Sequence, residues 1–356
     1  MTSETDRENI NEQQNDRDRV LAFLRRYAVN SISYLALESD KTWYFADSVE
    51  GVAAYTLFRR NMVICGDPVC AQDDLPDFLN ELKTFARRKH YRLIFLFTIA
   101  ENLPVYRKSG FGYYKGGEEA VFDLDTYDMS GGRAAKVRAS FHQARHEGLT
   151  VREYCPLFCR NRALETQFGE ITDSWMRMKH TSPLKFAIGG IGFDYPYDKR
   201  YFYAADAGGT IQGFMVFLPF RRKQGYMVDV MRRRHGCTHG VMELIFHDAC
   251  RQMKAEGVRY MSFGIAPLAN ANSDGRKTIF EGAEHYVYEN MNFIYGFKPL
   301  YVAKAKYAPA RWEPVYLVCR PRHMTLSMWY AMVSVLDTKG FGDYVRSFLN
   351  YRKSHK

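Results

Sequence analysis

Apolar positions in the first third of the chain alternate between strand-like runs and helical spacing. Leu75, Phe78, Leu79, Leu82 and Phe85 fall on one face of a helix, because residues three and four apart are neighbours on a helix surface. Short runs rich in aromatic and branched residues, separated by turn residues, are typical of strands. The pattern predicts helices over 18–37, 74–89 and 100–109, and strands over 42–47, 52–58, 62–65, 92–98, 111–114 and 120–124.

The second half of the chain repeats this order of elements. We predict helices over 164–178, 241–255 and 278–291, and strands over 200–205, 211–218, 226–231, 260–264 and 300–306. Three meandering strands, a helix, a strand, a helix and a strand therefore occur twice. This order resembles the plan of the GNAT acyltransferase fold, so we expect an α/β (α+β) protein. Its two GNAT-like domains in tandem would each be a mixed twisted sheet flanked by helices.

Changes in composition give the expected domain boundaries. The first 17 residues are polar, with almost none that could join a core, and are expected to be a disordered tail. The order of elements then indicates an N-terminal GNAT-like domain over 18–130, a basic linker helix over 131–150, a C-terminal catalytic domain over 151–320, and a basic helical tail over 321–356.

Charge and cysteine usage narrow the class of protein. The 356 residues carry 50 Lys+Arg against 40 Asp+Glu, a formal net charge of +10, which favours an anionic partner such as nucleic acid or a phospholipid surface. The seven cysteines form no CxxC pair, so reduced thiols and a cytosolic protein are expected. The start lacks the apolar core of a secretory signal, and the longest apolar stretches are too short to span a bilayer.

A basic stretch at 130–148 lies between the two halves. As a helix it would present a cationic face to a phosphate backbone, to which Arg133, Lys136 and Arg138 would contribute. A solvated helix without a partner is the alternative.

The densest group of candidate residues lies at 221–243. A strand ending near Asp229 runs through a basic turn with Arg232, Arg233 and Arg234 into a helix that carries Glu243 in its first turn. A helix N-terminus after such a turn favours bound phosphate. We expect Asp229 to stay ionised beside arginine, where it would bind a substrate ammonium. The turn fits the usual acetyl-CoA loop poorly.

Two further stretches are candidates for ligand contacts. Gly264 and Pro267 follow a strand, at a turn where ligands often bind. Lys304 and Lys306 alternate along a segment predicted to be extended, so they would point the same way, and Trp312 follows them. The sequence has no nucleophile motif of the Gly-x-Ser-x-Gly type, and its histidines lack metal-ligand spacing.

Ordered motifs over residues 25–320 resemble one known family. The chain is similar to the cytosolic catalytic domain of bacterial phosphatidylglycerol lysyltransferases and alanyltransferases, the multiple-peptide-resistance-factor family. The motifs are Gly66-Asp67-Pro68-Val69, Lys115–Ala120 before Phe122-Asp123-Leu124, the basic run 131–148, Ile171–Trp175, Asp229–Arg233 with Gly240 and Glu243, Gly264–Leu268, Tyr295–Lys298, Lys304–Tyr307 and Trp312–Tyr316.

The resemblance implies that an amino acid, lysine first and alanine next, moves from aminoacyl-tRNA to a glycerol hydroxyl of phosphatidylglycerol. The enzyme would act at the inner face of the membrane as a peripheral protein, with no metal and no cofactor besides its tRNA co-substrate. Asp229 and Glu243 would bind the ammonium, while Arg232 and Lys304 would contact the tRNA terminus and the developing negative charge. The further residues expected to bind substrate are Gly264, Pro267, Trp175, Trp312 and Glu313, and those expected to bind tRNA phosphates are Arg233, Arg234, Lys306, Lys298, Arg133, Lys136 and Arg138.

Three alternatives remain open from the residues alone. The first is an acyl-CoA N-acetyltransferase on the same fold. The second is an aminoacyl-tRNA-dependent transferase with another acceptor, such as a cell-wall peptide. The third is a non-catalytic pair of GNAT-like domains that binds tRNA or membrane.

Overall fold

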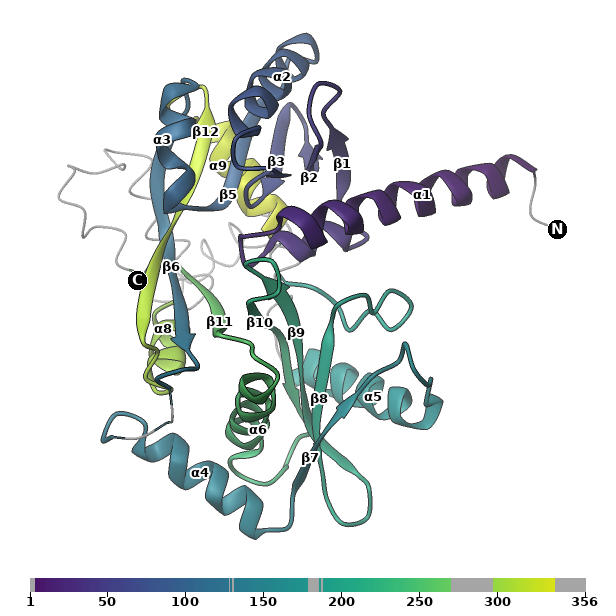
Figure 1. Cartoon of the computed structure of the whole chain (residues 1–356), viewed down its shortest axis with the longest axis vertical. Coiled ribbons are helices and arrows are strands. Elements are labelled where there is room, and N and C mark those ends of the chain that lie inside the picture. Colours follow the sequence, from purple (N-terminus) through teal and green to yellow (C-terminus); the bar gives the residue numbers. More distant parts are fainter. Residues whose placement is uncertain are drawn as a thin grey trace, which may run out of the picture.

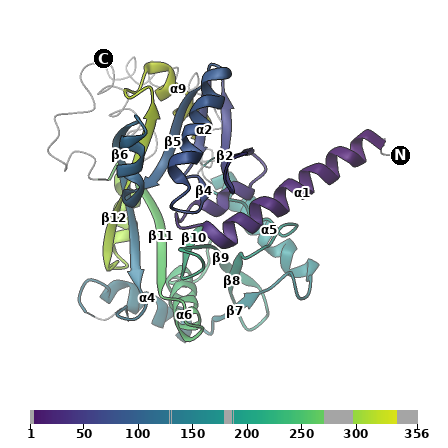
Figure 2. The ribbon, with the colours of Figure 1, turned by 45° about the horizontal axis from the view of Figure 1, so that its top comes forward.

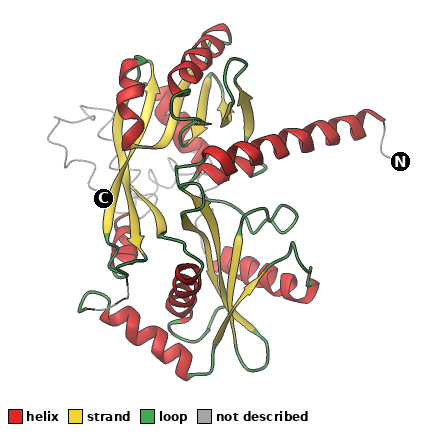
Figure 3. Ribbon diagram, in the orientation of Figure 1, coloured by secondary structure: helices red, strands yellow, loops and turns green. Residues whose placement is uncertain are grey.

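One continuous mixed sheet runs through the molecule. The computed structural model describes residues 4–127, 129, 131–178, 186, 188–269 and 297–336, and for 4–13, 297 and 298 it describes the backbone only. The strands follow the order β1-β2-β3-β5-β12-β6-β11-β10-β9-β8-β7, and β4 pairs with β2 beside this path. Helices lie on both sides of the sheet (Figures 1 and 3).

The first half begins with a long helix and continues as three antiparallel strands, a helix and two more strands (Figure 1). Four of the five residues expected on one face of α2 are buried, and Phe85 packs against the same core cluster as a partly buried residue. The elements are α1 Glu4–Tyr27, the 3-10 helix Ser33–Leu37, β1 Thr42–Phe45, β2 Gly51–Phe58, β3 Asn61–Cys65, β4 Val69–Cys70, α2 Leu75–Arg88, β5 Arg92–Ile99, the 3-10 helix Ala100–Asn102, α3 Leu103–Lys108 and β6 Gly112–Asp123.

The second half repeats the sequence of elements, as predicted. Strands β8, β9 and β10 form an antiparallel meander, α6 follows, and β11 returns parallel to β10. The elements are α4 Ala135–His146, β7 Thr150–Tyr154, α5 Arg162–Met178, β8 Arg200–Ala205, β9 Ile211–Phe220, β10 Gly225–Arg233, α6 Val241–Ala255, β11 Tyr260–Pro267, α8 Phe297–Ala305, β12 Arg311–Arg320 and α9 Leu326–Leu336.

The two halves exchange their last strands. Strand β12, the last of the second half, pairs with β5 of the first half, and β6, the last of the first half, pairs with β11 of the second. Strands β6 and β12 also pair with each other, so both lie at the centre of the common sheet (Figure 2). The boundaries of the two expected domains stay a prediction, but each half completes the sheet of the other.

Several predicted elements differ from those observed. Helix α1 starts at Glu4 and so includes 4–17, which belong to the expected tail, and the helix expected over 18–37 ends at Tyr27. Buried residues such as Leu24 anchor the second part of α1, and the polar first part continues the same helix away from the body (Figure 1). Strands predicted over 111–114 and 120–124 are one strand, β6.

Three other predictions are not confirmed as made: one is wrong, one lies outside the described residues, and one has different bounds. The segment 300–306, predicted as a strand, belongs to helix α8. The helix expected over 278–291 lies outside the described residues, as does the part of the expected tail after α9, 337–356. The linker helix is observed as α4 over a shorter range. In the part of the chain that the structure describes, no helix combines the length and the apolar character needed to cross a bilayer.

Candidate active site

Strands β10 and β11 diverge in the second half. They pair in parallel only where Gly225–Met227 lies beside Tyr260–Ser262, whereas the corresponding strands of the first half, β3 and β5, pair over the whole of Asn61–Cys65. Beyond the paired stretch, β10 stays with β9 and β11 stays with β6. In the second half the two parallel strands therefore separate, and we call the region between them beyond Met227 and Ser262 the opening. The corresponding strands of the first half stay paired, so that half has no such opening.

Each diverging strand has a bulge beside this opening. In β10 the register shifts between Val228 and Val230, with Asp229 at the shift. In β11 it shifts between Ser262 and Ile265, where Gly264 takes a φ of +69° that favours glycine. Bulges change the direction of side chains and are common beside active sites.

Asp229 has one carboxylate oxygen without a partner. Its Oδ1 accepts a hydrogen bond from the Gly189 backbone N–H at 2.8 Å, while its buried Oδ2 has no hydrogen-bond partner among the residues that the structure describes. Burial raises the pKa of Asp229 to about 6, although the Gly189 N–H and the charge of Lys199 act in the opposite direction. Loss of hydration thus outweighs the neighbouring cations and makes this carboxyl less acidic than usual, but a pKa of about 6 is still compatible with the expected ionised form at pH 7.

Glu38 lies beside Asp229 and was missed in the sequence. Its Oε2 accepts the Gly190 N–H at 3.2 Å, and its Oε1 accepts Lys199 Nζ at 2.8 Å. A Cβ at Gly189 would lie 2.4 Å from Asp229 Oδ2 and 2.9 Å from Glu38 Oε1. The two carboxylates therefore flank one glycine, and only a residue without a side chain fits between them.

Arg232 connects β10 to helix α5. Its guanidinium donates to Thr172 Oγ1 at 2.8 Å and lies 5.4 Å from the centre of the Trp175 ring. Burial lowers the pKa of Arg232 from its usual value, and the charges of Asp229 and Asp173 oppose that shift. The structure thus brings together three residues predicted for the site, Asp229, Arg232 and Trp175.

Lys304 lies against β11, on the other side of the opening. Its Nζ donates to the Ile265 carbonyl at 2.6 Å. Burial of the amine lowers its pKa to about 7, although the charge of Glu119 acts to raise it. The residue was predicted on an extended segment, but it reaches this position from helix α8.

A buried network behind Lys304 was also missed. Glu119 of β6 is hydrogen-bonded to Ser262 Oγ, and Ser262 Oγ accepts the Gly264 N–H at 2.8 Å. Burial raises the pKa of Glu119, while its hydrogen bond from Ser262 and the charge of Lys304 oppose the shift. Because the network bonds to the bulge itself, it holds the backbone that carries the Lys304 acceptor.

Glu243 contacts the end of α8 rather than Asp229. Its Oε1 accepts Lys306 Nζ at 2.7 Å and the Tyr307 hydroxyl at 3.2 Å. Burial alone would raise the pKa of Glu243, but Lys306 and Tyr307 outweigh it and lower the pKa. Its role in binding the substrate ammonium stays a prediction. In the structure the Glu243 carboxylate already pairs with Lys306, a cation of this chain.

The N-terminus of α6 is partly covered by α4. Gly240 has a φ of +85°, and a Cβ there would lie 1.9 Å from the Ser140 carbonyl oxygen. This carbonyl and the Glu243 carboxylate place negative charge where a pyrophosphate would approach. Both features argue against the acyl-CoA alternative.

Three further residues predicted to bind substrate make contacts within the chain. Trp312 stacks on Tyr301 at 4.2 Å, and Glu313 pairs with Arg221 and Arg311, each at 2.7 Å. Pro267 ends β11 opposite Gly117 of β6.

The predicted phosphate-binding cations differ in their solvent exposure and in their hydrogen bonds within the chain. Arg133, Lys136 and Arg233 are exposed. Arg138 donates to the Met129 and Gly131 carbonyls, and Arg234 donates to the Ile211 carbonyl. The side chain of Lys298 lies outside the described residues. Among the described residues, no cluster of His, Cys, Asp or Glu has the arrangement of a metal site.

Comparisons with known proteins identify relatives of the whole chain. Residues 21–319 match the family model described as phosphatidylglycerol lysyltransferase, C-terminal. A phosphatidylglycerol lysyltransferase of Bacillus subtilis is 28% identical over 330 residues, 93% of this chain and 38% of the relative. That of Staphylococcus epidermidis is 25% identical over 315 residues, 88% of this chain and 36% of the relative. The chain thus spans well under half the length of these curated relatives.

Solved structures agree with this match. The structure of L-PGS from Bacillus licheniformis has a TM-score of 0.77 at 26% identity and covers 90% of this chain and 95% of that one. The C-terminal domain of a putative lysylphosphatidylglycerol synthetase from Agrobacterium fabrum has a TM-score of 0.75 at 23% identity, with the same coverage. FemX shares the fold, with a TM-score of 0.55 at 10% identity, 89% of this chain and 98% of that chain being covered. The predicted mixed α/β fold of GNAT-like halves is confirmed, and the chain belongs to the phosphatidylglycerol lysyltransferase C-terminal family.

Proposed function

We propose that this chain is an aminoacyltransferase that moves an amino acid from the 3′ ester of aminoacyl-tRNA to a glycerol hydroxyl of phosphatidylglycerol. Lysine is the first candidate for the amino acid and alanine the next. The observation that carries the proposal is the opening between β10 and β11, which has Asp229 on one strand and Lys304 beside the other, in a chain of this family. The reaction takes place where the acceptor lipid is, at the inner surface of the membrane.

Asp229 binds the α-ammonium of the aminoacyl group in this proposal. Buried polar atoms in proteins are nearly always hydrogen-bonded, so an orphaned carboxylate oxygen needs a partner. A substrate ammonium supplies both the missing hydrogen bond and a compensating charge. Glu38 is a second carboxylate next to Gly189, and the side-chain ammonium of a lysyl group would share it with Lys199, an interaction that alanine does not offer.

Arg232 and Lys304 stabilise the negative charge that develops during transfer. The lipid hydroxyl oxygen attacks the ester carbonyl and gives a tetrahedral oxyanion, and the C–O bond to the ribose 3′-oxygen then breaks. The hydroxyl loses one proton and the leaving 3′-oxygen gains one, so the reaction needs no oxidant or external energy source. Preorganised cations next to an oxyanion typically contribute about 10²–10³ in rate per donor.

Exposed cations would bind the tRNA backbone. Arg233 is the last residue of β10, Lys136 lies in the first turn of α4, and Arg133 lies two residues before that helix. Lys306 would share its charge between Glu243 and a phosphate. Trp175 and Trp312 offer aromatic faces for stacking of the unpaired 3′ nucleotides.

A transfer assay tests the proposal. The purified chain would be mixed with phosphatidylglycerol vesicles and with lysyl-, alanyl- or arginyl-tRNA, each labelled in the amino acid. We expect label in the lipid phase from lysyl-tRNA. Binding of tRNA without lipid label from any donor would contradict the proposed acceptor.

A further inference from the structure

The loop 155–161, between β7 and α5, presents apolar side chains to solvent. Phe158 is 92% exposed and Leu157 is 57% exposed, and no other large apolar side chain in the described part of the chain is as exposed as Phe158. The backbone N–H groups of Phe158 and Cys159 both donate to the Cys155 carbonyl, at 3.1 and 3.3 Å. The loop tip is therefore a closed turn with its apolar residues pointing outward.

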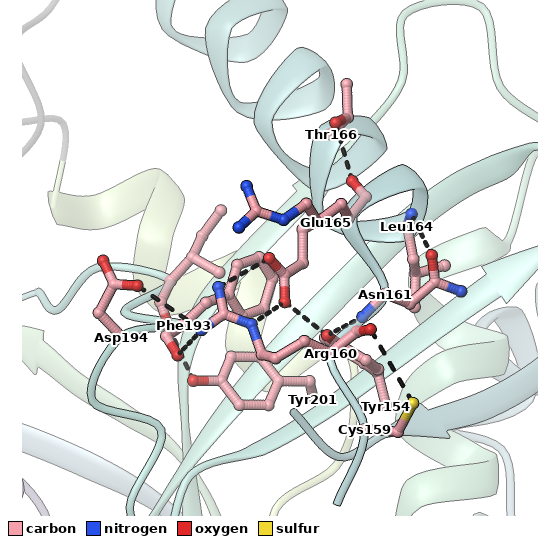
Figure 4. Close-up of polar contacts among 12 residues, drawn as sticks. Tyr154, Cys159, Arg160, Asn161, Leu164, Glu165, Thr166, Phe193, Asp194 and Tyr201 are labelled. Atoms are coloured by element: carbon pink, nitrogen blue, oxygen red, sulfur yellow. Dashed lines mark hydrogen bonds and ion pairs between the residues drawn. The ribbon is translucent and has the colours of Figure 1, made fainter. Parts of the chain in front are cut away.

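A polar network fixes both ends of this loop (Figure 4). The Asn161 N–H donates to the Tyr154 hydroxyl at 2.9 Å, and that hydroxyl donates to Glu165. The Arg160 guanidinium bonds both oxygens of Glu165 and donates to the Phe193 carbonyl at 3.2 Å. Because hydrogen bonds hold the loop at both ends, the fold itself exposes the tip, and loop mobility is not needed to explain the exposure.

Exposed arginines flank the loop on both sides, while Arg160 within the loop is paired with Glu165 and lies 3.6 Å from Asp194. Arg152 on β7 and Arg162 at the start of α5 are exposed, and the whole chain carries a formal charge of +10. Aromatic and aliphatic side chains enter the interfacial zone of a bilayer, while arginines beside them reach lipid phosphates. An anionic phospholipid surface fits this combination better than neutral lipid does.

Helix α5 connects the loop to the candidate active site. It starts at Arg162, directly after the loop, and its residues Thr172 and Trp175 contact Arg232. The separation along the helix between Arg162 and Trp175 is about 20 Å. A surface bound at the loop would therefore lie at a fixed distance from the reacting groups.

We infer that Leu157 and Phe158 insert into the surface of an anionic phospholipid bilayer and so dock this face of the protein on the membrane. The inference rests on the proposed function in one respect, that the acceptor is a lipid of such a bilayer. It adds the docking element, which the proposed reaction itself does not specify.

Vesicle binding of a double variant tests the inference. Flotation with vesicles of equal parts phosphatidylglycerol and phosphatidylcholine would compare the wild-type chain with Leu157→Ser/Phe158→Ser. We expect binding weakened by about 10-fold or more, since two apolar side chains lose their burial. Leu326→Ser, at another apolar residue that is 61% exposed, is the matched control and should bind like the wild type. Equal binding by the double variant and the wild type would overturn the inference and assign the tip to a protein surface.

Cysteines beside the tip provide an independent readout. Cys155 and Cys159 are exposed, so a polarity-sensitive fluorophore can be attached to Cys159 in a chain that carries Cys155→Ser and Cys237→Ser. We expect its emission to shift to the blue with the anionic vesicles and to stay unchanged with phosphatidylcholine alone. Unchanged emission with anionic vesicles would contradict insertion. Because neither measurement uses tRNA, a chain that docks through this loop but transfers nothing contradicts only the proposed function.

Discussion

At the scale of single residues, two groups in the candidate active site titrate near neutral pH. Burial raises the pKa of Asp229 to about 6 and lowers that of Lys304 to about 7. In both cases the loss of hydration disfavours the charged form. The charges that the proposed reaction needs are therefore maintained only over a narrow pH range.

The pH dependence of kcat/KM should show both groups. Asp229 loses its charge as the pH falls through about 6, and Lys304 loses its charge as the pH rises through about 7. We expect a bell-shaped profile with its maximum between these values. Lys304→Arg should keep the cation at higher pH and extend the alkaline limb. Activity of the wild type that still increases well above pH 7 would instead indicate that the neutral amine of Lys304 is the active form.

The buried charge of Asp229 should also reduce stability. Its pKa is raised in the folded state, so the folded protein binds the proton more tightly, and stability falls as the pH rises from about 4 to about 6. The full cost, up to about 3 kcal/mol, is present at pH 7. Asp229→Asn should therefore melt at a higher temperature than the wild type at pH 7 and show no such gain at pH 4. Asp77→Asn, at an exposed position in the first turn of α2, is the control and should not melt at a higher temperature than the wild type at pH 7, because its charge favours the helix N-terminus.

Sequence reasoning named Asp229, Arg232 and Lys304 but missed Glu38 and Glu119. The first three stand in motifs whose neighbours are also charged or glycine-rich. Glu38 follows a short helix of the first half and stands in none of the motifs, and Glu119 stands in the motif Lys115–Ala120 but lies inside a strand, where the sequence does not indicate which part of the fold it faces. Only the tertiary fold brings them to the opening between β10 and β11.

At the scale of elements, α8 shows where local pattern reading fails. Residues 303–306 alternate alanine and lysine, which led us to predict a strand over 300–306, yet the chain is helical there up to Ala305. The helix places Lys304 on the Ile265 carbonyl and ends where Lys306 and Tyr307 contact Glu243. These tertiary contacts stabilise a conformation that the alternation alone does not indicate.

The segment with Gly189 and Gly190 offers a matched pair of substitutions. In Gly189→Ala the new Cβ would displace Asp229 Oδ2, so we expect transfer to fall by about 10²-fold, the usual effect of misplacing a group by about 1 Å. In Gly190→Ala the nearest atom, Glu38 Oε2, lies at 3.5 Å, an ordinary contact, so activity should stay close to wild type. Equal activity of the two variants would show that the position of Asp229 is not critical.

At the scale of the whole molecule, the exchange of strands could not be predicted. The sequence indicates the order of most elements in each half and which faces are apolar, but β7 and β12 were not predicted as strands. The pattern of apolar residues in β6 and β12 does not indicate whether each strand pairs within its own half or with the other half. The observed pairing of β6 with β11 and of β12 with β5 depends on contacts between residues distant in the sequence. The repeat of elements was therefore predictable, whereas the single shared sheet was not.

Charge over the whole molecule should govern tRNA binding. Each exposed cation that contacts a phosphate contributes about 1 to the slope of log K against log salt. Arg133→Gln/Lys136→Gln, just before and in the first turn of α4, should weaken binding and lower the slope by about 2. Lys89→Gln, at the exposed end of α2, is the control and should leave the slope unchanged. A slope that is the same in the α4 double variant and the wild type would place the tRNA on another face.

The central claim is that amino acids are transferred to lipid at the opening between β10 and β11. Its most direct measurement is single-turnover transfer from labelled lysyl-tRNA to phosphatidylglycerol vesicles at pH 6.5 by the wild type and by Asp229→Asn. We predict label in the lipid from the wild type, and a rate about 10²-fold lower from the folded variant, which lacks the negative charge that binds the ammonium. Equal rates in the two proteins would contradict the assignment of this site, and absence of lipid label from the wild type would contradict the reaction itself.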